Sequence, residues 1–153
     1  MTRSARALVT IKITNLNRDF LINAESAQVL ARSIARGIKP PKKQIDIIFL
    51  DSRRIRKLNA RFRGSRRATD VLSFDLGQVA NIFISLDAAG SNAKRFRTSF
   101  EREGVLYMIH GVLHLARYDD DTVLAAARMR RREERLLRKI CGKIDLSKVL
   151  TRR

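Results

Sequence analysis

The sequence has few of the residues on which secreted domains and membrane proteins depend. Its 153 residues include a single cysteine, Cys141, which excludes an internal disulfide and a cysteine-based zinc site. The lack of disulfides fits a reducing compartment. No uninterrupted apolar run exceeds five residues, too short for a membrane-spanning helix. Residues 1–6 are basic, but an alternating segment follows instead of an apolar signal core. We therefore expect a cytoplasmic protein, with a short organelle-targeting extension as the alternative.

Acidic residues are scarce too. The chain has 33 Lys and Arg against 15 Asp and Glu, a net charge of +18, which attracts polyanions. Nucleic acid is the expected partner, and an anionic membrane surface is the competing interpretation. The cations form two clusters: residues 53–67, with eight and no acid, and residues 128–139, with seven beside Glu133 and Glu134. Either cluster alone is typical of a solvated helix face, but two of this density favour RNA contact.

Aromatic residues are also few: seven Phe, two Tyr and no Trp. This composition does not indicate a base-stacking platform. We expect the protein to recognise the shape and phosphates of structured RNA, with binding that weakens steeply as salt rises.

The residue pattern predicts one α+β domain over residues 1–153, with a small mixed sheet packed against helices. Expected strands cover residues 8–13, 45–50, 71–74 and 80–85, and expected helices cover residues 24–36, 52–62, 86–96, 99–116 and 122–140. The first helix should end at Gly37, since two prolines follow shortly. The fourth is apolar nearly all round, which predicts a buried helix in the middle of the domain.

The only two histidines, His110 and His114, lie on that central helix. Four residues apart, they project from one face and can share a metal ion. The alternative is a pair of core histidines satisfied by hydrogen bonds. The triplet 119–121, all aspartate, follows the helix and offers a third ligand, although Asp121 could instead cap the next helix.

Three protein ligands with an open fourth position define a hydrolytic zinc site. Such an ion would activate water and polarise a phosphoryl oxygen. Metalloproteases carry a glutamate directly after the first histidine as general base, but this chain has Gly111 there. A peptidase is therefore not expected.

Three collinear motifs resemble those of the YbeY family, bacterial endoribonucleases of ribosomal RNA maturation. Residues 110–120, HGVLHLARYDD, resemble its signature HGxLHLxGYDH. Residues 59–64, NARFRG, with 68–74, ATDVLSF, are similar to its YRGxxxPTDVLSF. Residues 81–87, NIFISLD, are similar to its GDIxIS segment. The resemblance covers roughly residues 9–140.

The resemblance implies one zinc ion per chain and cleavage of RNA, notably small-subunit ribosomal RNA, in ribosome biogenesis. The implied metal ligands are His110, His114 and Asp120, and the implied catalytic residues are Arg63 and His114. We expect RNA contacts from Arg61, Arg63, Arg66 and Arg67. The implied partners are ribosomal RNA and the small ribosomal subunit or its precursors, with no membrane and no nucleotide cofactor.

The chain departs from the family pattern at several positions. Asp120 stands where the family has histidine. Its carboxylate should hold a metal but reduce the Lewis acidity of that metal. Arg117 replaces a glycine, so we expect a left-handed backbone after the helix to be less accessible. Ala80-Asn81 stands in place of Gly-Asp, and Asp75 in place of proline.

Three functional hypotheses follow. The first is a zinc-dependent single-strand endoribonuclease that acts on ribosomal RNA, as the resemblance implies. The second is a non-catalytic ribosome-assembly factor that binds RNA through its basic faces and uses any metal structurally. The third is an iron oxygenase, because two histidines and one carboxylate are also that ligand set; the net charge and the spacing along a buried helix speak against it.

Overall fold

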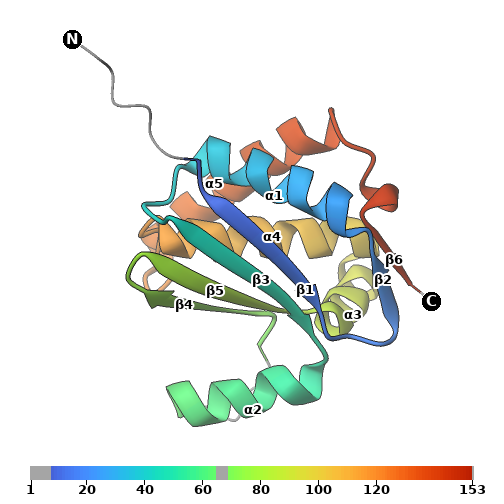
Figure 1. Cartoon of the computed structure of the whole chain (residues 1–153), viewed down its shortest axis with the longest axis horizontal. Helices are drawn as coiled ribbons and strands as arrows, with labels where there is room; N and C mark the ends of the chain where they lie inside the picture. The colour runs from blue at the N-terminus through green and yellow to red at the C-terminus, as the bar shows by residue number, and fades with distance from the viewer. Residues whose placement is uncertain (1–7, 65–68, 153) are drawn as a thin grey trace.

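The computed structural model describes residues 8–64 and 69–152 (Figure 1). A four-stranded sheet has the order β1-β3-β5-β4, in which the first three strands are parallel and β4 is an antiparallel edge strand. Its strands are β1 (Thr10–Asn15), β3 (Gln44–Leu50), β4 (Val71–Leu76) and β5 (Val79–Ser85). The helices are α1 (Ala24–Ile38), α2 (Ser52–Arg63), α3 (Leu86–Phe96), α4 (Phe100–Leu115) and α5 (Val123–Cys141). The prediction of an α+β domain with a mixed sheet is confirmed.

Helices cover the two faces of the sheet unequally. On one face α1, α4 and α5 form a layer, whereas α2 lies alone on the other (Figure 1). The alternation of β3 serves both faces: Ile45, Ile47 and Phe49 enter the main core, and Leu50 belongs to a small cluster under α2. The large core therefore lies on the α4 face.

The expected buried helix is α4, which sits in the middle of that core. Ser99 caps its start by accepting a hydrogen bond from the backbone N–H of Arg102. Gly111 faces the sheet so closely that a Cβ there would lie 2.5 Å from Cγ2 of Ile82. A glutamate at this position would not fit, which gives the absence of a protease-type motif a structural cause.

The expectation that the first helix ends at Gly37 is wrong. Helix α1 continues to Ile38, and Lys39 takes the left-handed conformation at its end, with φ of 58°. Gly37 instead allows close packing against α5, since a Cβ there would lie 2.9 Å from Leu136. By contrast, Gly64 does end α2 in the left-handed conformation, as expected.

Two short strands were not expected. Strand β2 (Phe20–Ile22) pairs antiparallel with β6 (Leu150–Arg152), just after a 3₁₀ turn at Leu146–Lys148. Residues near the two ends of the chain thus meet beside α1 (Figure 1). Within the described residues, no helix combines the length and apolar character needed to cross a membrane.

Candidate metal centre

His110 and His114 lie on the last turns of α4, with their rings turned toward each other. Their Nε2 atoms are 3.0 Å apart, and the ring planes meet at 82°. Oδ2 of Asp120 lies 3.8 Å from Nε2 of His110, and one ligand atom from each residue falls within 4.8 Å of the others. Ligands about 2 Å from a tetrahedral zinc ion are separated by about 3.3 Å. The three donors therefore need only small shifts to share one ion.

The turn after α4 carries Asp120 back toward the histidines. Arg117 has φ of 67°, and the backbone N–H groups of Arg117 and Tyr118 donate to the carbonyls of His114 and Leu113. The left-handed conformation therefore forms even without glycine, at a cost of roughly 1 kcal/mol. The structure corrects one detail: Thr122, not Asp121, caps the next helix by accepting from the N–H of Ala125.

The surroundings of His114 favour its neutral imidazole form. Burial, and next the nearby His110, lower the pKa of His114 from its ordinary value, while Asp120 and Asp119 oppose the shift. A neutral ring offers a nitrogen lone pair at neutral pH, which a metal ligand requires. The side chains of His110 and Asp120 keep 29% and 49% of their surface exposed, so solvent and a substrate can reach the cluster.

Glu133 orients the first histidine. This residue of α5 is buried, and its carboxylate accepts a short hydrogen bond from Nδ1 of His110. Because Nδ1 meets Glu133, Nε2 is the ring nitrogen that faces His114 and Asp120. Sequence reasoning treated Glu133 only as an acid in a basic run. A signal was available, since it shares a buried helical stripe with Met129, Leu136, Leu137 and Ile140.

Arg63 ends α2 on the opposite face of the sheet. Its Nη2 donates to the carbonyl of Ser73 on β4 at 3.0 Å, and its guanidinium lies 5.7 Å from the ring of Phe74. Ser73 in turn donates its hydroxyl to the carbonyl of Gly111 at 3.0 Å. One edge strand therefore joins Arg63 to the residue that follows His110. Of the other expected RNA contacts, Arg61 is exposed, and Arg66 and Arg67 lie outside the described residues.

A second polar group contacts α4, the helix that carries the two histidines. Asn92 donates to Asp70 at 3.3 Å and to the hydroxyl of Tyr107 at 2.5 Å. Burial raises the pKa of Asp70, although the neighbouring His110 opposes this shift. Sequence reasoning did not identify this group, because its members come from α3, α4 and the residue before β4 and share no local pattern.

Two departures from the family motifs have local explanations. Asp75, in the place of proline, accepts from Lys42 at 2.5 Å and from the backbone N–H of Gly77, and so ties the β4–β5 turn to the loop before β3. Ala80 is fully buried in β5, and Asn81 pairs with Phe74 across the strands. Both lie in the sheet rather than in the ligand cluster.

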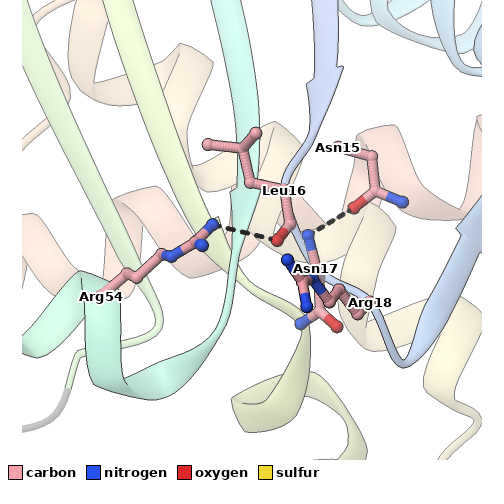
Figure 2. A pocket seen from close by; sticks show the side chains of 5 residues that line it. All are labelled: Asn15, Leu16, Asn17, Arg18 and Arg54. Atoms are coloured by element: carbon pink, nitrogen blue, oxygen red, sulfur yellow. Dashed lines mark hydrogen bonds between the residues drawn. The ribbon is translucent and has the colours of Figure 1, made fainter.

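The pocket in Figure 2 lies elsewhere, near the carboxyl ends of β1 and β3. Arg54 donates to the carbonyl of Leu16 at 3.1 Å, and the N–H of Asn17 donates to the side chain of Asn15 at 2.9 Å. Arg18 completes the lining. These bonds tie the β1–β2 loop to the first turn of α2, and no His, Cys or carboxylate lines the pocket.

The chain is similar to known proteins in both sequence and fold. The family model described as "Endoribonuclease YbeY" matches residues 10–141. The chain is 34% identical over 138 residues to an endoribonuclease YbeY of Chlorobium phaeovibrioides, covering 85% of this chain and 90% of the relative. It is 30% identical over 151 residues to one of Caldanaerobacter subterraneus, covering 81% and 94%. A solution structure of a Thermotoga maritima protein matches with a TM-score of 0.63 and 26% identity, over 88% of this chain and 91% of that one.

Proposed function

This chain belongs to the YbeY family of endoribonucleases, and we propose that it is a zinc-dependent endoribonuclease that acts in ribosomal RNA maturation. The RNA-cleaving reaction follows from the family. The metal, the RNA and the residues that act are our proposal. Its proposed setting is the cytoplasm, and its proposed partners are ribosomal RNA and the small ribosomal subunit or its precursors.

The convergence of His110, His114 and Asp120 supports the metal most strongly. It is the only group of three or more such side chains that comes together in residues 8–64 and 69–152. Two histidines and a carboxylate form one of the ligand sets of hydrolytic zinc enzymes. When bound, zinc supplies Lewis acidity toward water and a phosphoryl oxygen.

The protein residues in turn hold and orient the reacting groups. Asp120 balances one of the two positive charges of the ion, so the proposed site is less electropositive than one with three histidines. Glu133 accepts from Nδ1 of His110 and so directs Nε2 of that ring at the site. Arg63, at the end of the most basic helix, is suited to hold a phosphate and to stabilise charge that develops on it.

The test compares cleavage with RNA binding. Zinc-loaded protein and its His114→Ala variant are incubated with precursor small-subunit RNA, free and within ribosomal particles. We expect the variant to lose at least a hundredfold in cleavage rate and to bind RNA as the parent does, because the change leaves the exposed cations of α2 in place. Zinc-loaded parent protein that leaves every precursor intact would overturn the enzymatic proposal.

A non-catalytic assembly factor is the second candidate, because the exposed cations of α2 lie on the face of the sheet away from the ligand cluster. It predicts that His114→Ala still supports assembly of ribosomal particles. Metal analysis of anaerobically purified protein separates both candidates from an iron oxygenase, which would carry stoichiometric iron.

A further inference from the structure

Phe62 is a large apolar side chain that the fold leaves in solvent. It is the penultimate residue of α2, with 58% of its surface exposed. Its ring meets that of Phe74 edge-on, with centroids 5.6 Å apart, and Phe74 meets Phe83 in the same way at 5.7 Å. An exposed phenylalanine alone needs no explanation. Here, however, the exposed ring packs against Phe74, which packs against Phe83, and these contacts fix its position.

Two guanidinium groups lie beside Phe62 and the ring that supports it. The guanidinium of Arg61 lies 5.3 Å from the centroid of Phe62, and that of Arg63 lies 5.7 Å from the centroid of Phe74. Helix α2 has no acid within its bounds, and all of its cations are exposed: Arg53, Arg54, Arg56, Lys57, Arg61 and Arg63. An aromatic ring within a positive, exposed surface is the arrangement by which proteins bind single-stranded nucleic acid.

The position of the ring relative to the metal centre agrees with this interpretation. Phe74 and Ser73 are neighbours on β4, so their side chains point to opposite faces of the sheet. Phe74 supports Phe62 on the α2 face, and Ser73 bonds Gly111 on the α4 face. The edge strand β4 therefore contacts both the aromatic surface and the helix that carries the ligand cluster.

We propose that Phe62 is the stacking site for one unpaired base of a single-stranded RNA, with Arg61 and Arg63 at the neighbouring phosphates. The strand then crosses the edge of β4 toward His110 and His114. This inference rests on the proposed function for the identity of its ligand. A base reaches the ring only when it has left a duplex, so the site selects single-stranded segments. The low aromatic count concealed it, because three of the seven phenylalanines, Phe62, Phe74 and Phe83, gather at one place.

The chain itself offers a matched control. Phe96, at the end of α3, is equally exposed at 58%, and the guanidinium of Arg95 lies 5.3 Å from its ring. It is the last residue of α3, on a different helix from the Phe62–Phe74 contact. If Phe62 binds RNA specifically, RNA should affect Phe62 and not Phe96. Non-specific binding by exposed aromatic side chains would affect both.

The first experiment uses tryptophan fluorescence. The chain has no tryptophan, so Phe62→Trp and Phe96→Trp each introduce a single reporter. With EDTA present to prevent cleavage, a short single-stranded RNA of mixed sequence should quench the emission at position 62 and leave that at position 96 unchanged. A blunt RNA duplex should quench neither. Equal quenching at both positions, or a response at position 62 only to anionic lipid vesicles, would overturn the proposal.

The second experiment measures affinity with Phe62→Leu, which keeps an apolar contact with Phe74 and removes the stacking face. We expect roughly 5- to 100-fold weaker binding of the single strand, the loss that follows removal of a base–aromatic stack. The slope of log K against log salt should stay the same, whereas Arg61→Ala should reduce it by about 0.7. An affinity within twofold of the parent would contradict the stacking role.

Binding in EDTA requires neither metal nor cleavage. An inactive parent protein whose single-strand affinity still depends on Phe62 would defeat the proposed enzyme and leave this site standing. An active parent whose single-strand affinity does not depend on Phe62 would support the proposed enzyme and overturn the stacking site.

Discussion

The two faces of the sheet differ in how they are covered. The α4 face is closed by α1, α4 and α5 over a large apolar core, and the ligand cluster is set at the rim of that core. The α2 face has one helix over a small cluster of Leu50, Ile55 and Leu72, and that helix exposes cations. Groups that must keep ångström-scale geometry thus lie on the well-covered side, whereas exposed cations lie on both sides, on α2 and on α5. Four substitutions test this division.

Arg63→Ala should have the largest effect, because Arg63 bonds Ser73 on the edge strand β4, and Ser73 in turn bonds Gly111 on α4. We expect cleavage at saturating RNA to fall about a hundredfold, the usual loss when one stabilising donor is removed from a transition state. Arg36→Ala, an equal change of charge on α1, serves as the control. Single-turnover rates measure the difference. Equal losses in the two variants would show that only net charge matters and that the faces are not joined at β4.

Glu133→Gln should weaken zinc affinity about 10- to 100-fold, because a neutral amide orients His110 less well than a carboxylate does. Glu134→Gln is the matched control: that neighbour pairs with Arg102 and does not touch a ligand. Competition with a zinc chelator gives both affinities. If the two variants bind zinc alike, the contact between α5 and His110 has no part in the site.

Gly111→Ala tests the tight packing of the α4 face. The added methyl group would lie 2.5 Å from Ile82, so we expect a loss of about 1–3 kcal/mol in the free energy of unfolding. At Gly90 in α3 nothing lies within 4 Å, and Gly90→Ala should stabilise by about 0.5–1 kcal/mol. Urea denaturation followed by circular dichroism measures both. A neutral Gly111→Ala variant would contradict the close approach of α4 to β5.

Arg117→Gly should have the smallest effect. Glycine adopts the positive φ at the end of α4 without strain, so we expect a gain of roughly 0.5–1 kcal/mol in the free energy of unfolding. Thermal unfolding of the metal-free protein is the measurement. A destabilised variant would mean that the side chain of Arg117 makes a compensating contribution to the turn.

Elements with local signals were predictable. Helix α3 has the predicted bounds, and α2 begins after Asp51 and ends before Gly64, because its two caps are encoded at its own ends. Strands β2 and β6 have three residues each and pair across almost the whole chain, so no local periodicity marks them. The predicted end of α1 at Gly37 was wrong because the sequence does not distinguish a glycine needed for close packing from one that ends a helix.

The candidate site was predictable to a similar degree. The four-residue spacing of His110 and His114 predicts their approach, since a helix fixes it. The choice of Asp120 among three aspartates came from family resemblance, because the path of a loop does not follow from spacing. Glu133 was missed, although a carboxylate on the buried stripe of α5 indicates a buried partner.

The central claim is that His110, His114 and Asp120 bind one metal ion. Calorimetric titration of metal-free protein with zinc tests it most directly, beside the variants Asp120→Ala and Asp121→Ala. We predict one site per chain, weakened at least tenfold by the change at Asp120 and unaffected by the change at its exposed neighbour Asp121. Equal affinity in all three proteins, or no binding in the parent, would contradict the account.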